Sequence, residues 1–353
     1  MCKGLGNYIH SDVLPAIRHI VVQHNHLVAK TNDACTTPPT NLGIPSYIAG
    51  LNVTCFPRDA IEDHFNVLQS LKLQSKQLGF LLAVRKKFNI ELHEILGSFD
   101  FSNTAIKNAL INDFNVLEPE VGSSGCTQLE DVANQTKSEI NNIPDLIQKD
   151  LTSLHIAELL CLIVGTSKPG TYSSVWHSTF NCPCTPKACV DQWMNYLLDF
   201  GSRDRFIIDI ARTTDADNQL PWVKYLLKEY EYCISGWNAH RYNSDLDIEH
   251  FFGAWNSISA LVNPSIIFDE NHYNNSFRNC IGNKLILDSS LNRGIRLHTP
   301  IAKINPSYLT GVGVTGSSKQ ISGDLIGASD INCYRLYVLL RSLRLAAFAA
   351  IRF

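Results

Sequence analysis

Charged residues are scarce in this chain of 353 residues, and it has no long run of one charge. Asp, Glu, Lys and Arg make up 18% of the sequence, against about a quarter in an ordinary soluble domain. Because 45% of the residues are hydrophobic, the chain can bury sizeable cores, and we do not expect it to be disordered. No uninterrupted apolar run reaches the roughly 18 residues that a membrane span requires, so we expect no membrane partner.

A secretion signal and an evident disulfide framework are also lacking. Residues 1–8 contain no apolar segment of the length found in signal peptides. The 11 cysteines are scattered and odd in number. Together these features predict free thiols and a cytoplasmic, reducing compartment.

Apolar residues at helical spacing dominate the first two thirds of the chain. This pattern predicts helices within 59–99, 103–117, 129–164, 191–209 and 221–234. Pro144 follows two asparagines, which favours the start of a new helix there. Gly236-Trp237-Asn238 ends the last of these helices. We therefore predict a mainly α protein, with a helical region of unclear role at 1–236 and a second domain at 237–353.

The net charge of −3 is divided unevenly along the chain. Residues 241–353 hold 11 Lys and Arg against 8 Asp and Glu, whereas the preceding residues hold 19 against 25. A mildly basic C-terminal part is typical of a polyanion site, although three charges alone are weak evidence for one.

The densest group of thiols is Cys182, Cys184 and Cys189, with His177 just upstream. Zinc sites usually use two ligand pairs with two to four residues inside each pair, and this spacing differs. Spare thiols in a proline-containing loop are the favoured interpretation. A zinc-stabilised helical interaction module is the alternative.

Two stretches carry the residues for a hydrolytic site. Leu-Asp-Ile-Glu-His at 246–250 alternates apolar and acidic residues, which predicts a short strand. The second stretch begins with Gly-Asn at 282–283, a turn signal, continues through an apolar strand and ends on Ser-Ser-Leu-Asn at 289–292, where a helix can start. A histidine with a pKa near neutrality can activate water, and carboxylate and amide oxygens suit Mg²⁺.

The order Glu249-His250, then Asn283, then Asn292 nine residues later resembles the HNH endonuclease (ββα-metal) motif. The finer similarity is to the C-terminal nuclease domain of GmrSD-type, modification-dependent restriction endonucleases, and it covers about residues 220–353. Flanking positions that match the family are Asp247, Ile248, Trp255, Ile281, Gly282, Leu285, Leu287, Leu291, Lys303 and Tyr308.

The resemblance implies a small α+β ββα-metal domain with a closing C-terminal helix. It implies metal-dependent hydrolysis of DNA phosphodiester bonds in restriction of foreign DNA, an antiviral defence. His250 is then the general base and Asn283 orients the loop through backbone hydrogen bonds. Glu249 and Asn292 hold Mg²⁺, or another divalent cation such as Mn²⁺, with Asp247 as a further metal ligand. The expected substrate-binding residues are Lys303 and Lys284.

The chain departs from the family in three places, one of which is Lys284, where the family usually has a leucine after Gly-Asn. Phe251-Phe252-Gly253 follows the histidine where an apolar residue and a proline are usual. Residues 1–240 lack the family's nucleotide-using motif and any glycine-rich phosphate loop, so we find no NTP site and allow for a separate DNA-recognition or NTP-using subunit. A catalytically silent DNA-binding or assembly subunit with the HNH fold is the alternative function.

The C-terminal segment 331–353 is predicted to be an amphipathic helix that docks on the nuclease domain. Its arginines Arg341, Arg344 and Arg352 share one face of that helix. Contact of these arginines with DNA phosphates is the less favoured alternative.

Overall fold

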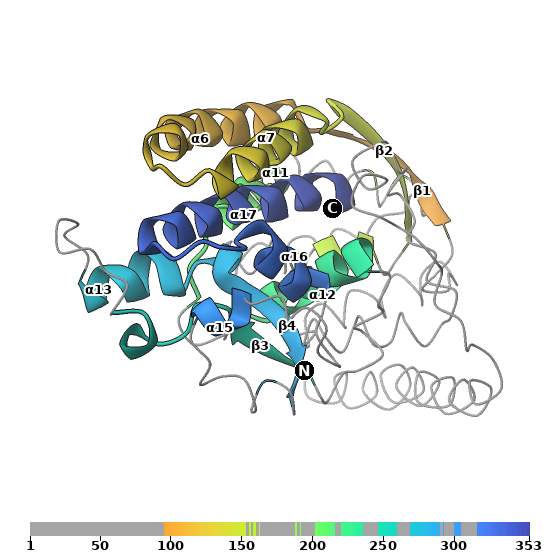
Figure 1. Cartoon of the computed structure of the whole chain (residues 1–353). Helices are drawn as coiled ribbons and strands as arrows, with labels where there is room; N and C mark the ends of the chain where they lie inside the picture. The colour runs from red at the N-terminus through yellow and green to blue at the C-terminus, as the bar shows by residue number, and fades with distance from the viewer. Residues whose placement is uncertain are drawn as a thin grey trace. The chain divides into compact units, whose positions relative to one another are not determined.

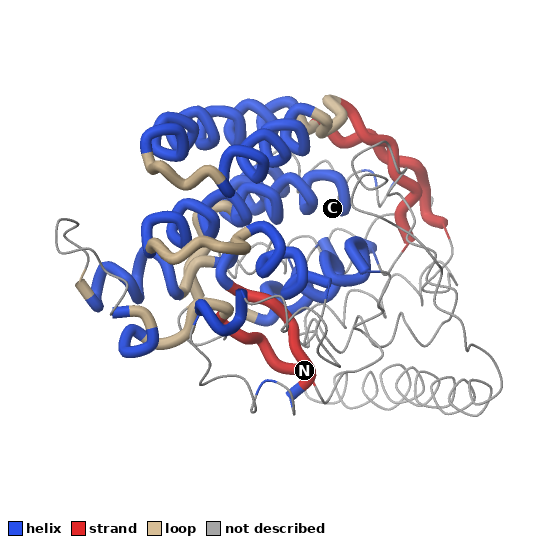
Figure 2. The backbone as a smooth tube through the Cα atoms, viewed as in Figure 1, coloured by secondary structure: helices blue, strands red, loops and turns tan. Residues whose placement is uncertain are grey.

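The structure is a computed structural model, and it describes residues 95–152, 202–215, 220–235, 246–259, 269–289, 300–304 and 316–353, with a few single positions between them. The described part is mainly helical, as the sequence predicts, with two small two-stranded sheets (Figure 2). The predicted helices before residue 95 and the cluster Cys182, Cys184 and Cys189 lie outside these ranges.

Two predicted helical stretches are strands. β1 (Ile95–Ser102) and β2 (Leu146–Thr152) form the first sheet, so the predictions of a helix through 95–99 and of a helix start at Pro144 are wrong. Buried and exposed residues alternate along most of both segments, and this period of two is that of a strand and not of a helix. Asn103, which is fully buried, donates from its side chain to Pro144 O at 3.1 Å and joins the ends of the two strands.

Helices from both halves of the chain pack in one compact unit that includes residues 100–148 and 201–353. Its helices are α6 (Thr104–Ser123), α7 (Gln128–Asn141), α11 (Ser202–Ile210), α12 (Pro221–Ser235), α13 (Glu270–Tyr273), α15 (Pro300–Ile304), α16 (Gly316–Asp324) and α17 (Ile331–Arg352). The helices α6, α7 and α11 precede the predicted boundary at 236/237 and pack on α17, which follows it. The predicted boundary therefore runs through a packed core.

The last helix, α17, forms the centre of this unit (Figure 1). It begins at a capped end, where the Asp330 side chain accepts from Asn332 N at 2.6 Å. The pair α6–α7 covers one side of it, and α12 and the turn before β4 contact it elsewhere. The predicted helix at 331–353 is confirmed. Nearly all of its residues are buried, so the face that carries the arginines is not exposed to solvent as an amphipathic helix would lead one to expect.

Three of the four arginines of α17, which are Arg341, Arg344 and Arg352, are held inside the protein. Arg344 forms hydrogen bonds to both carboxylate oxygens of Glu139 at 2.8–3.1 Å, and Arg352 Nε donates to Glu229 Oε2 at 2.6 Å. Arg341 has no exposed surface and donates to backbone carbonyls. The alternative that these arginines contact DNA is therefore excluded in this conformation, because each is buried and already bound within the protein.

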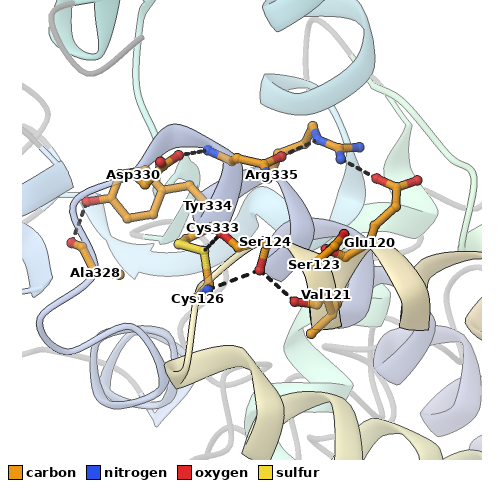
Figure 3. Close-up of a disulfide and its surroundings, with 11 residues drawn as sticks. Glu120, Val121, Ser123, Ser124, Cys126, Ala328, Asp330, Cys333, Tyr334 and Arg335 are labelled. Carbon is orange, nitrogen blue, oxygen red and sulfur yellow. Dashed lines mark hydrogen bonds and ion pairs between the residues drawn. A yellow bond between two sulfur atoms is a disulfide. The ribbon is translucent and has the colours of Figure 1, made fainter. Parts of the chain in front are cut away.

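A disulfide links Cys126, in the turn after α6, to Cys333 in the first turn of α17, with the Cα atoms 5.8 Å apart (Figure 3). Beside it, Arg335 forms an ion pair with Glu120. The prediction of free thiols is therefore wrong for this pair, because the fold brings together two cysteines separated by 207 residues. Cys233 and Cys280 are buried and form no disulfide within the described residues.

Candidate active site

The site residues predicted from the sequence are arranged around an antiparallel hairpin. β3 (Leu246–His250) pairs with β4 (Lys284–Asp288), and the register sets Glu249 opposite Leu285 and His250 opposite Lys284. The three-residue turn η7 (Ile281–Asn283) leads directly into β4. After β4 the chain is helical at Ser289 and at Asn292.

Asn283 fastens the turn before β4 to the chain directly after His250. Its side chain is fully buried, accepts from Phe252 N at 2.8 Å and donates to Phe252 O at 3.0 Å and to Arg278 O at 2.9 Å. The backbone adds a bond from Phe251 N to Asn283 O at 2.9 Å. These are the backbone hydrogen bonds that a loop-orienting asparagine requires.

The segment after His250 is packed rather than open. Phe251 and Phe252 are each 1% exposed, and the ring of Phe252 stacks on Tyr334 of α17 with centroids 4.7 Å apart. The Tyr273 hydroxyl donates to Gly253 O at 2.7 Å and lies 3.2 Å from Phe252 O. Tyr273 carries no recognisable signal in the sequence, because its contact with Gly253 joins residues that are 20 positions apart.

The other side of the turn is held by α17. Gly282 N donates to Ser342 Oγ at 3.0 Å, and Arg341 Nη1 donates to Gly282 O at 2.6 Å and to Lys284 O at 2.7 Å. A Cβ atom at Gly282 would lie 2.0 Å from Val338 O, so only glycine permits this approach. Helix α17 therefore positions Asn283 through the carbonyls on both sides of it.

His250 ends β3 with its ring largely buried. Its Nε2 atom is buried and has no hydrogen-bond partner in the described part of the chain. The pKa of the imidazole is lowered to about 3, first by burial and then by nearby cations, which are Lys284, Arg278 and Lys303. The imidazole is therefore neutral at pH 7, and its pKa lies below the near-neutral value that the sequence leads us to expect for a general base.

The candidate metal ligands are oxygen-bearing side chains, two of them just before His250 and the third, Asn292, after β4. Asn292 Oδ1 is buried and lacks a hydrogen-bond partner within the described residues, and Asp247 is exposed two residues before Glu249. Glu249 Oε1 is 2.9 Å from Lys303 Nζ, and no hydrogen bond to Glu249 Oε2 is found among the described residues. An unpartnered amide oxygen and a carboxylate oxygen fit a hard cation such as Mg²⁺, which needs only one or two protein ligands.

Buried polar atoms without a hydrogen-bond partner gather in this part of the chain. Such atoms are rare in folded proteins and often mark functional sites. Among the described residues between 250 and 292 they are His250 Nε2, Asn274 Oδ1, Arg278 Nε, Asn279 Oδ1 and Asn292 Oδ1.

The two lysines predicted to bind substrate point into the protein instead. Lys303 is 1% exposed and donates to Glu249 Oε1 and to Phe251 O, each at 2.9 Å. Lys284 is 0% exposed and forms an ion pair with Asp215 Oδ2 at 3.2 Å. This arrangement does not support the prediction of phosphate contacts, because neither ammonium group is accessible and both are already compensated.

No group of three or more His, Cys, Asp or Glu side chains gathers at a point within the described ranges. No helix there is both long enough and apolar enough to cross a membrane. Comparison of the chain with protein-family models, curated proteins and solved structures finds no match.

Proposed function

We propose that residues 246–292 form the active site of an HNH-type endonuclease that hydrolyses DNA phosphodiester bonds with a divalent cation. The observation that carries the proposal is the link from Asn283 to Phe252. It holds the residue two positions after His250 against the turn before β4, within the hairpin of β3 and β4. Asn283, His250, Glu249 and Asn292 have the order and spacing of the motif described above.

His250 is the general base in this proposal. Its neutral imidazole accepts a proton at Nε2 from a water molecule, whose oxygen then forms a bond to phosphorus as one P–O ester bond breaks. Glu249 and Asn292 hold the cation, with Asp247 as a further ligand. When bound, Mg²⁺ or Mn²⁺ stabilises the negative charge that develops on the phosphate and the leaving oxygen.

The substrate class is proposed from the resemblance and from the excess of basic residues in 241–353. DNA is the expected partner, and restriction of foreign DNA in the cytoplasm is the expected role. A separate subunit that recognises DNA or uses NTP is part of this proposal.

The Lys303–Glu249 ion pair favours a second candidate. A lysine that compensates the carboxylate of a metal ligand removes part of the charge that attracts the cation. The alternative is therefore a DNA-binding or assembly subunit that retains the fold without turnover. It predicts retention of DNA without cleavage under any divalent metal.

Nicking of supercoiled plasmid DNA in Mg²⁺ and in Mn²⁺ tests the proposal. We expect activity in the wild type and its loss in His250→Ala and in Glu249→Gln. The matched control is His272→Ala, because His272 is an exposed histidine of α13. Equal nicking by the wild type and His250→Ala, with both proteins shown to be folded by circular dichroism, would contradict the assignment of His250 as the catalytic base.

A further inference from the structure

The cations near His250 differ in whether their charge is already compensated. Lys284 faces Asp215 at 3.2 Å and Lys303 faces Glu249 at 2.9 Å. Arg278 has no carboxylate partner within the described part of the chain. Its side-chain Nε atom is buried and has no hydrogen-bond partner there either. Arg278 is therefore the cation of this group whose charge remains available to a ligand.

The backbone places Arg278 beside the candidate base. Arg278 ends the π-helical turn η6 (Asn274–Arg278), and its carbonyl accepts from Asn283 Nδ2 at 2.9 Å. The same amide nitrogen donates to Phe252 O at 3.0 Å. One amide group thus joins Arg278 to the segment that follows His250. The positive charge is close enough to lower the pKa of His250, after the larger effects of burial and of Lys284.

The chemistry of a guanidinium in this position suits a phosphate. Arginine cannot neutralise itself by losing a proton at ordinary pH, so a buried N–H without an acceptor is costly until a ligand supplies one. Its planar donors match the oxygens of a phosphate in pairs, which makes the bond both strong and directional. Arg278 as a whole is partly exposed, so it lies at the edge of the packed core.

We infer that Arg278 binds a phosphate of the DNA backbone and so holds the nucleic acid at the site of His250. This inference rests on the proposed function, and it transfers the role expected of Lys303 and Lys284 to Arg278. A phosphate contact of this kind contributes to affinity without reading the base sequence.

Binding of a short, fluorescently labelled DNA duplex tests the assignment. The full chain is titrated in EDTA, so that no metal is present and cleavage plays no part, over a series of salt concentrations. For Arg278→Gln we expect affinity about tenfold weaker at low salt, because one charged hydrogen-bonding contact is lost. We also expect the slope of log K against log salt to become shallower by about 0.9, because one phosphate contact is removed.

Two further variants make the outcome specific. Arg205→Gln removes the same charge from an 80% exposed arginine of α11 and should retain wild-type affinity. Arg278→Lys keeps the charge and loses the paired donors, so it should bind more weakly than the wild type with an unchanged salt slope. It also provides the test if Arg278→Gln fails to fold.

The failures of the two proposals are distinguishable. If the wild type binds DNA and both Arg278 variants behave like Arg205→Gln, the assignment of Arg278 is overturned while the proposed function stands. If the wild type does not bind the duplex at any salt concentration, the assignment of Arg278 is overturned, and the proposed function fails with it if plasmid nicking in Mg²⁺ and in Mn²⁺ is absent as well.

Discussion

The Lys303 ammonium lies 2.9 Å from Glu249 Oε1, so the residue expected to bind phosphate neutralises the residue expected to bind metal. The same ammonium donates to Phe251 O at 2.9 Å and thereby fixes the chain after His250. In the absence of a cation, Lys303 therefore supplies positive charge to the candidate metal ligand.

Replacement of this lysine tests that relationship. Lys303→Met leaves a largely buried carboxylate uncompensated and should lower the free energy of unfolding by about 3 kcal/mol. Added Mn²⁺ should restore more of the lost stability in Lys303→Met than it adds to the wild type, because the cation replaces the missing charge. Thermal unfolding with and without Mn²⁺ measures both effects. An equal Mn²⁺ effect in the two proteins would contradict a metal role for Glu249.

Asn283→Ala should remove both activity and stability. The fully buried amide makes three backbone hydrogen bonds, and the alanine leaves Phe252 N, Phe252 O and Arg278 O without that partner. We expect a loss of about 2–4 kcal/mol in denaturant unfolding and faster hydrogen exchange at the amide of Phe252. Asn275→Ala, at an exposed asparagine, is the control and should change neither quantity. Unchanged exchange at Phe252 in Asn283→Ala would contradict the role of Asn283 in orienting the loop.

Gly282→Ala tests the contact between α17 and the turn. The new methyl group would meet Val338 O at 2.0 Å and Ser342 Oγ at 2.6 Å, so backbone must move. We expect a loss of about 1–3 kcal/mol in the free energy of unfolding. Gly323→Ala in α16 is the matched control, because a Cβ there meets nothing within 4 Å, and it should be neutral or slightly stabilising. Similar stabilities for the two variants would show that the close contact between the turn η7 and α17 does not contribute to stability.

Lys228 should make the stability of the protein depend on pH. It is 1% exposed, and its pKa is lowered to about 7 by burial and then by Lys224. The unfolded chain, with a lysine pKa near 10.5, therefore binds more protons than the native protein between pH 7 and pH 10.5. The free energy of unfolding therefore rises with pH across that window, because the buried lysine no longer has to carry a charge. The gain is lost again as the pH falls to 7.

From pH 7 to pH 9 the expected gain is about 2 kcal/mol. Lys228→Met should abolish it, as measured by urea unfolding at several pH values. The same pH dependence in the variant and the wild type would assign the effect to other groups.

The Cys126–Cys333 disulfide should be detectable by peptide mapping without reduction. It closes a loop of about 207 residues, so chain entropy alone suggests about 5 kcal/mol of stabilisation. Reduction, or replacement of both cysteines by serine, should therefore lower the unfolding temperature by several degrees. Recovery of both cysteines as free thiols from oxidised protein would contradict the pairing.

The local pattern of the sequence was sufficient to predict the two strands of the hairpin. Alternation at 246–250 and the apolar run after Gly282-Asn283 correctly predict β3 and β4, because a strand requires a period of two or burial on both faces. Helical spacing likewise predicts α6, α7, α12 and α17. The same reasoning failed at β1 and β2, where a few apolar residues fit either period and the pairing of the strands decided the outcome.

Tertiary structure alone decided which charges are available. In the sequence Lys284, Lys303 and the arginines of α17 are indistinguishable from surface cations, because their partners are distant along the chain. Folding brings Lys303 to Glu249, Lys284 to Asp215 and Arg344 to Glu139, and buries each pair. The sequence by itself determined the order of acid, histidine and asparagines. Long-range packing determined that Asn283 braces Phe252 and that Arg278 has no carboxylate partner among the described residues, since both depend on contacts that no local spacing encodes.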